Sequence, residues 1–96
     1  MLHIHDLTVD EKRAIDNVRT RFYWSQHREL AIIAKRQGIK FPELVRDLGQ
    51  IEAMFAILQD QTSVLPIFLL SMLRQTEREA IDETRASARP ISTYWS

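Results

Sequence analysis

The sequence predicts an all-α fold: a small bundle of three or four helices followed by a short flexible C-terminal tail. Apolar residues recur at three- and four-residue steps along three long segments, which is the period of helices that bury one face. The chain has only two glycines and three prolines, and most of them fall at the ends of those segments. No stretch alternates apolar and polar residues for long enough to predict a sheet.

The first predicted helix covers residues 9–37. Thr8 and Glu11 have the spacing of a capping box at its start, and Gly38 can end it. A straight helix of this length would extend about 43 Å, whereas a compact domain of this size is roughly 32 Å across. We therefore favour a break near Ser25, which could cap a second helix. The alternative is an unbroken helix that overhangs and packs against another subunit.

The second predicted helix covers residues 42–59, with Pro42 in its first turn, where the missing N–H is tolerated. An apolar stripe follows at helical spacing (Leu44, Leu48, Ile51, Phe55 and Leu58). Gly49 lies inside this segment, where glycine disfavours a helix by about 1 kcal/mol relative to alanine. It indicates either a close approach of a neighbouring backbone or a bend.

The third predicted helix covers residues 63–85 and changes character along its length. Its first half is apolar on every side, so it must be enclosed by other parts of the protein or by a partner. Its second half, from Arg74, is almost wholly charged or polar, and we expect a solvated helix end there. We expect one helical domain over 1–86 and a tail over 87–96, disordered or docked.

Composition limits the function. The 96 residues include 13 basic and 13 acidic side chains, and this balance argues against a surface wholly devoted to nucleic acid. There is no cysteine, and therefore no disulfide framework and no thiolate nucleophile. The first residues do not resemble a secretion signal, and no apolar run is long enough to span a membrane. We expect a cytoplasmic protein.

No catalytic constellation can be assembled from the sequence, and we expect a protein that is not an enzyme and needs no cofactor. There is no nucleophile elbow, no glycine-rich phosphate loop and no pair of carboxylates in surroundings that would shift their pKa values. His3 and His5 have the spacing of two metal ligands on one side of a strand, but His27 is the only other histidine. We expect a solvated N-terminus there and no metal site.

The apolar helix indicates the function that we expect. In a small bundle, two neighbouring helices cover only part of a helix that is apolar all round, and the uncovered part suits a protein interface. This predicts a binding protein (an adaptor, inhibitor or regulatory protein) whose partner is a second copy, as a homodimer, or another protein. If the helix is central, its back is covered internally instead. The expected interface residues are Leu65, Phe68, Leu69 and Met72, with Trp95 from the tail.

The alternative is a nucleic-acid-binding transcriptional regulator. Residues 19–40 hold six basic side chains and one acid, with three aromatic residues among them, a combination that can hold phosphates and stack on bases. The basic candidates, which also suit an acidic partner, are Arg19, Arg21, Arg28, Lys35, Arg36 and Lys40.

A degenerate helix-turn-helix around residues 26–52 belongs to the same hypothesis. Ala34, Gly38 and Leu44 have the spacing of the small residue, the turn glycine and the apolar residue of that motif. The pattern departs elsewhere, because Asp47 stands where an apolar residue is expected. The helix that would read DNA also carries three acids and a single base, and acids repel phosphates.

Overall fold

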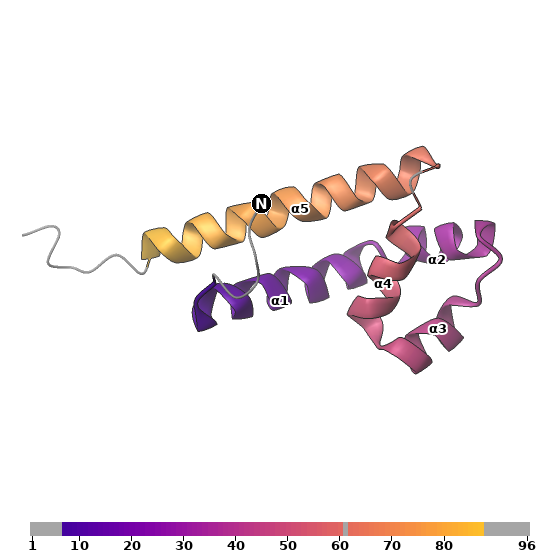
Figure 1. Ribbon diagram of the computed structural model, residues 1–96, viewed down its shortest axis with the longest axis horizontal. Helices are drawn as coiled ribbons and strands as arrows, with labels where there is room; N and C mark the ends of the chain where they lie inside the picture. The colour runs from indigo at the N-terminus through magenta and orange to yellow at the C-terminus, as the bar shows by residue number, and fades with distance from the viewer. Residues whose placement is uncertain (1–6, 61, 88–96) are drawn as a thin grey trace, which may run out of the picture.

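The computed structural model describes residues 7–60 and 62–87, which form five α-helices (Figure 1). They are α1 (Val9–Ser25), α2 (His27–Arg36), α3 (Phe41–Leu48), α4 (Gln50–Leu58) and α5 (Val64–Ser87). The described residues contain no strand, so the prediction of an all-α fold is confirmed. The predicted count of three or four helices is wrong. The predicted tail lies outside the described residues from position 88 onward.

One of the two additional breaks lies near Ser25, where the sequence favours it. α1 ends at Ser25 and α2 begins at His27, because Gln26 between them leaves the helical conformation, with φ −107° and ψ 15°. The break is thus confirmed, but the predicted cap is not. The Ser25 hydroxyl donates to the Phe22 carbonyl at 3.2 Å, and Gln26 precedes α2 without a side-chain cap bond.

The second break divides the helix predicted over 42–59. Gly49 adopts φ 90° and ψ 165°, a conformation that is essentially restricted to glycine. Its N–H donates to the Val45 carbonyl at 2.7 Å, and its own carbonyl accepts from the Ala53 N–H at 3.0 Å. Gly49 therefore ends α3 and starts α4 in one residue, and a single continuous helix here is wrong.

Both predicted end signals of the first segment are confirmed. The Thr8 N–H donates to Glu11 Oε1 at 2.9 Å, and the Glu11 N–H donates to Thr8 Oγ1 at 3.1 Å, which is a complete capping box. After α2, Gly38 has φ 75° and donates to the Lys35 carbonyl at 3.0 Å. These signals are local, and the sequence reports them directly.

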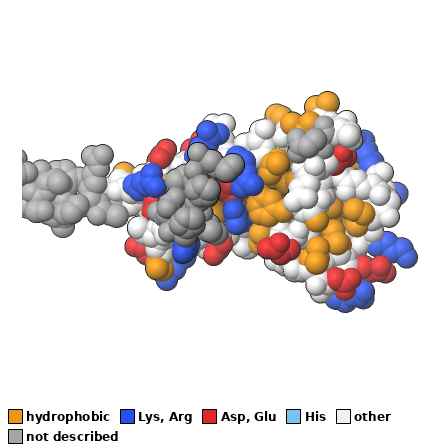
Figure 2. Space-filling view, viewed as in Figure 1, with side chains coloured by type: hydrophobic (Ala, Val, Ile, Leu, Met, Phe, Trp, Pro, Cys, Tyr) orange, Lys and Arg blue, Asp and Glu red, His pale blue; other side chains and the backbone are white. Residues whose placement is uncertain are grey.

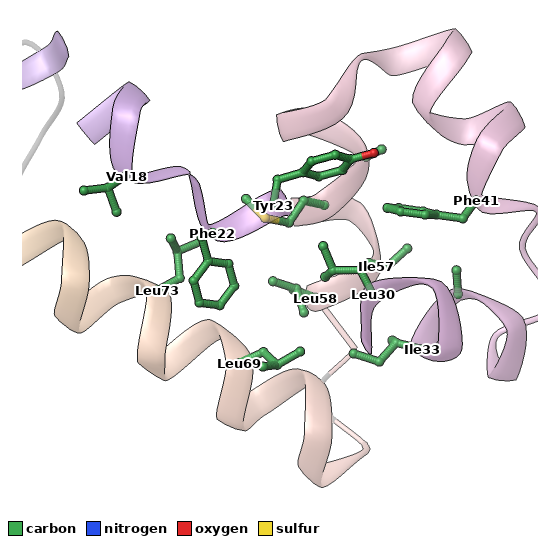
Figure 3. Close-up of a cluster of buried hydrophobic side chains, with 13 residues drawn as sticks. Val18, Phe22, Tyr23, Leu30, Ile33, Phe41, Ile57, Leu58, Leu69 and Leu73 are labelled. Atoms are coloured by element: carbon green, nitrogen blue, oxygen red, sulfur yellow. The ribbon is translucent and has the colours of Figure 1, made fainter. Parts of the chain in front are cut away.

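α1 and α5 run antiparallel, side by side, and α2, α3 and α4 gather at the end where α1 finishes and α5 starts (Figure 1). The apolar core lies at this end, where Phe22, Leu69 and Leu73 from the long pair meet Leu30, Ile57 and Leu58 (Figure 3). Space-filling Figure 2 shows charged side chains over the opposite end of the pair and hydrophobic ones mainly over the half with α2–α4.

The second half of α5 is exposed on most of its surface, as its composition predicts, but one of its faces packs against α1. Glu77 and Ile81 are buried against α1. Glu77 accepts from Arg19 Nε of α1 at 2.5 Å and from Arg74 Nη1 at 2.9 Å, and Glu11 is paired with Arg85. The charges of this half therefore help to join α1 and α5.

No helix among residues 7–60 and 62–87 is long and apolar enough to cross a bilayer.

Candidate protein-binding surface

Four large apolar side chains of α5 point away from the core. Val64, Ile67, Phe68 and Met72 are between 37% and 83% exposed, with Phe68 at 58%. They follow one another at steps of one, three or four residues, so they lie on one face of the helix. Leu69 and Leu73 occupy the opposite side, in the core. We call these four residues the outer stripe.

The structure sorts the predicted interface residues. Phe68 and Met72 are exposed, as an interface requires, and Leu65 is half-buried. Leu69 is only 2% exposed and is a core residue, so it cannot belong to an exposed binding surface of the folded monomer. Each residue turns the helix by about 100°, which carries Leu69 from the face of Phe68 toward α1. Trp95 lies outside the described residues.

Val64 and Ile67 are exposed beside Phe68 but are not among the predicted interface residues. Nearly every position from 64 to 70 is apolar, so the pattern does not distinguish a buried face from an exposed one. The distinction depends on where α1 and α4 pack. The one sequence pattern that indicates the buried face is the four-residue spacing of Leu69, Leu73, Glu77 and Ile81. It predicts the side that faces α1 only if the charged Glu77 is counted as a buried residue.

The segment of α5 that carries the outer stripe contains no charged residue. No Asp, Glu, Lys or Arg occurs between positions 61 and 73. Met72 also lines a shallow groove of about 350 Å³ between α1 and α5, together with Phe22, Arg21 and Thr76. Farther along α5, Arg78, Glu79 and Asp82 are exposed. The apolar surface is thus bordered by charges of both signs.

The six basic candidates do not act as one group. Arg19 is taken up by the pair with Glu77, and its guanidinium lies 4.9 Å from the centre of the Phe55 ring. Arg21, Arg28, Lys35, Arg36 and Lys40 are exposed, and none of them forms an ion pair within the described part of the chain. They are distributed over α1, α2 and the turn that precedes α3.

The aromatic residues of the basic segment divide between core and surface. Tyr23 is 3% exposed, and this burial raises the pKa of its hydroxyl. Trp24 is 59% exposed, and its ring stacks on that of His27 with centres 5.9 Å apart and planes at 23°. Part of an indole ring thus lies at the surface within the basic segment.

The helix-turn-helix spacing is matched only in part. Ala34 is buried, Gly38 makes the turn, and Leu44 packs against the core. The would-be reading helix, however, is broken at Gly49, and α3 presents exposed Glu43 and Asp47. Its only base, Arg46, is paired with Asp47 at 3.5 Å. This outer surface would repel phosphates.

No group of His, Asp and Glu side chains in the described ranges is placed to hold a metal ion. His3 and His5 lie outside them. His27 is engaged by aromatic rings, with Phe41 on α3 at 5.7 Å and Tyr23 at 5.5 Å between ring centres. The outer stripe of α5 is therefore the site that the geometry brings forward.

Comparison with known protein families, with characterised proteins and with solved structures finds no significant match to this chain.

Proposed function

We propose that this chain is a non-catalytic binding protein that self-associates through the outer stripe of α5. The observation that supports the proposal is the exposure of Val64, Ile67, Phe68 and Met72 on one helix face, opposite the core. Exposed apolar surfaces of this kind typically mark protein interfaces. Phe68 lies near the middle of the stripe, where aromatic residues contribute most to binding.

The proposal also accounts for the composition of α5. A solvated helix face is usually charged, yet this face remains apolar for about two turns, from Val64 to Met72. The core does not require apolar residues on this exposed face, because Pro66, Leu69 and Leu73 already form the buried face of the same segment. Association with a protein surface removes the exposed side from water as well.

The test is the absolute mass in solution, measured by light scattering after size exclusion over a range of concentrations. We expect the mass of the unmodified chain to rise above 11.3 kDa toward twice that value as concentration increases. Phe68→Glu should keep the mass at that of a monomer, because it places a charge in the centre of the interface. Its circular dichroism should remain that of a folded helical protein.

Ile32→Glu is the matched control. Ile32 is also a large apolar residue with an exposed side chain, but it lies on the outer face of α2. It should leave the association unchanged. A chain that remains monomeric at every concentration would contradict self-association, and equal effects of the two variants would remove the outer stripe from the interface.

A second candidate function, binding of single-stranded nucleic acid, is favoured by one observation. The exposed Trp24 ring belongs to the segment 19–40, which is rich in basic residues, and base stacking on an aromatic ring combined with phosphate contacts is the usual mode of such binding. Its test is the affinity for a single-stranded oligonucleotide at rising salt. A steep fall, abolished by Trp24→Ala, would support it, and absence of binding at low salt would remove it.

A further inference from the structure

We propose that one outward side of α1 and α2 binds single-stranded nucleic acid, with phosphates on Arg21, Arg28 and Lys35 and a base stacked on Trp24. We call these four residues the basic strip. The inference rests on the second candidate function given above and adds the surface that performs it. It does not depend on the outer stripe of α5.

The four residues lie along one side of the two helices. They follow one another at steps of three, four and seven residues, which on a helix places them on one side over about 21 Å. The junction keeps this register, because the Gln26 N–H donates to the Phe22 carbonyl and the Leu30 N–H to the Gln26 carbonyl, both at 2.9 Å. In Figure 1, α2 continues from α1 in nearly the same direction. The basic strip is therefore one continuous surface.

The basic strip faces away from the core and carries no acid. All four of its residues are exposed, whereas Phe22, Leu30 and Ile33 occupy the buried side of the same helices. Between residues 17 and 42 the only acidic residue is Glu29. It is half-buried and lies about 100° around α2 from Arg28. A side that combines three cations with no exposed acid attracts phosphates.

The three cations are available to a ligand. Arg21, Arg28 and Lys35 take part in no ion pair within residues 7–60 and 62–87. Arg21 Nε donates to the Asn17 carbonyl of its own helix at 3.5 Å, a long and weak bond that a phosphate can replace. Arg19, by contrast, is held in an ion pair with α5 and lies outside the basic strip.

Trp24 supplies the surface on which a base can stack. Its side chain is 59% exposed, although its ring contacts the Tyr23 ring edge-on at 5.0 Å and stacks on the His27 ring at 5.9 Å between centres. These two contacts fix the orientation of the indole, so less conformational entropy is lost on binding. Exposed aromatic rings combined with cations are the means by which proteins hold single strands.

Two observations favour a single strand over a duplex. Stacking on Trp24 requires an unpaired base, which a duplex does not offer. In addition, α3 borders the basic strip on the side of His27, whose ring lies 5.7 Å from that of Phe41, and α3 exposes Glu43 and Asp47. These acids limit the favourable surface to a strip about one helix wide and repel the second backbone of a duplex.

A membrane surface fits the basic strip less well. Helices that lie on a bilayer insert a broad apolar face, but the apolar faces of α1 and α2 are already buried in the core. Near the basic strip, the large apolar side chains that the described residues expose are Trp24 and Ile32. Anionic vesicles are therefore a control ligand and not the expected one.

The test is the binding of a labelled oligothymidine of about a dozen nucleotides, followed by fluorescence anisotropy at rising salt. The logarithm of the binding constant should fall with the logarithm of the salt concentration by about 0.7 for each phosphate that is neutralised, and so by about 2 for three cations. Arg28→Gln should reduce this slope by about 0.7. Arg78→Gln, which removes an exposed arginine of α5, is the matched control and should leave the slope unchanged.

Trp24 is tested separately. Trp24→Ala should weaken the binding at least about fivefold, and circular dichroism checks that the variant remains helical. In a Trp95→Phe background Trp24 is the only tryptophan. Its fluorescence should then be quenched when oligothymidine binds, because a stacked base contacts the indole directly.

The outcomes separate the basic strip from the candidate function. No binding at low salt would overturn both. Binding that Arg28→Gln and Arg78→Gln weaken equally, or that leaves the Trp24 fluorescence unchanged, would overturn the basic strip and leave the candidate function standing. A duplex of the same length that binds as tightly would refute the single-strand preference. Phosphatidylglycerol vesicles or polyglutamate that bind in place of oligothymidine would show a different anionic partner and overturn the inference.

Discussion

At the scale of single residues, Glu77 shows most clearly that contacts in the fold decide whether a charged side chain is buried or exposed. It lies in a run of mixed charge, which by itself is typical of a solvated helix. In the fold it is buried between Arg19 and Arg74, whose guanidinium groups both lie over the ring of Phe55 at about 5 Å. One carboxylate thus connects α1 with α5, and the two arginines that it binds contact α4 through Phe55.

We expect Glu77→Gln to lower the free energy of unfolding by about 2 kcal/mol, because it leaves two arginines without their buried counter-charge. Glu79→Gln, on the exposed side of the same helix, should change it by less than about 0.5 kcal/mol. Urea unfolding curves measure both. Equal values for the two variants would mean that the Glu77 cluster does not contribute to stability.

Glu11 gives a prediction about pH. The Thr8 N–H that donates to its carboxylate, assisted by Arg85, lowers the pKa of Glu11 in the folded protein below its ordinary value of 4.5. The unfolded chain therefore takes up this proton at a higher pH than the folded one. The stabilisation by ionised Glu11 is complete above the unfolded pKa and is lost as the pH falls through the folded pKa.

The comparison of the unmodified chain with Glu11→Gln isolates this effect. We expect the difference in their unfolding free energies to be constant from pH 6 to 7 and to shrink below about pH 4.5. Thermal or urea unfolding across this range measures it. A difference that does not depend on pH would show that the ionised form of Glu11 makes no special contribution.

At the scale of helices, glycine conformation separates α3 from α4. Gly49 has φ 90°, and among the described residues no atom beyond Gly49 and its two chain neighbours lies within 4 Å of the place where a Cβ would be. The requirement for glycine is therefore conformational and does not arise from crowding. This decides between the two interpretations that the sequence left open, in favour of a bend.

We expect Gly49→Ala to lower the free energy of unfolding by about 1–3 kcal/mol, because alanine is strained in this conformation. Gly38→Ala, at φ 75°, should lower it by roughly 1–2 kcal/mol. Chemical denaturation gives both values. If Gly49→Ala instead stabilises the protein and raises its helix content, α3 and α4 have joined into one helix and the break is not required by the fold.

At the scale of the whole molecule, one side of α5 packs in the core and the other is exposed. Leu69 and Leu73 face α1 and the core, whereas Phe68 and Met72 face outward. The neighbouring positions 68 and 69 therefore offer a direct test of which face is buried.

We expect Leu69→Ala to lower the free energy of unfolding by about 2–5 kcal/mol, the usual effect of a cavity in a core. Phe68→Ala should leave the stability of the monomer within about 1 kcal/mol and weaken association instead. Denaturation at low protein concentration measures the first quantity, and solution mass at high concentration the second. If Phe68→Ala is the more destabilising at low concentration, the assignment of the two faces is reversed.

The sequence by itself determined the fold class and the local signals, namely the capping box at Thr8 and Glu11 and the stop at Gly38. It also favoured a break near Ser25 over an unbroken, overhanging helix. These features depend on neighbours within four residues or on chain length, so periodicity and spacing suffice to find them. It did not determine which face of residues 64–73 is buried, because apolar residues cover every side of that helix. Only the packing of α1 and α4 against α5 places Leu69 inside and Phe68 outside, and buries Glu77 beside Arg19. Burial depends on contacts between residues far apart in the chain, such as positions 19 and 77, and local periodicity carries no information about them.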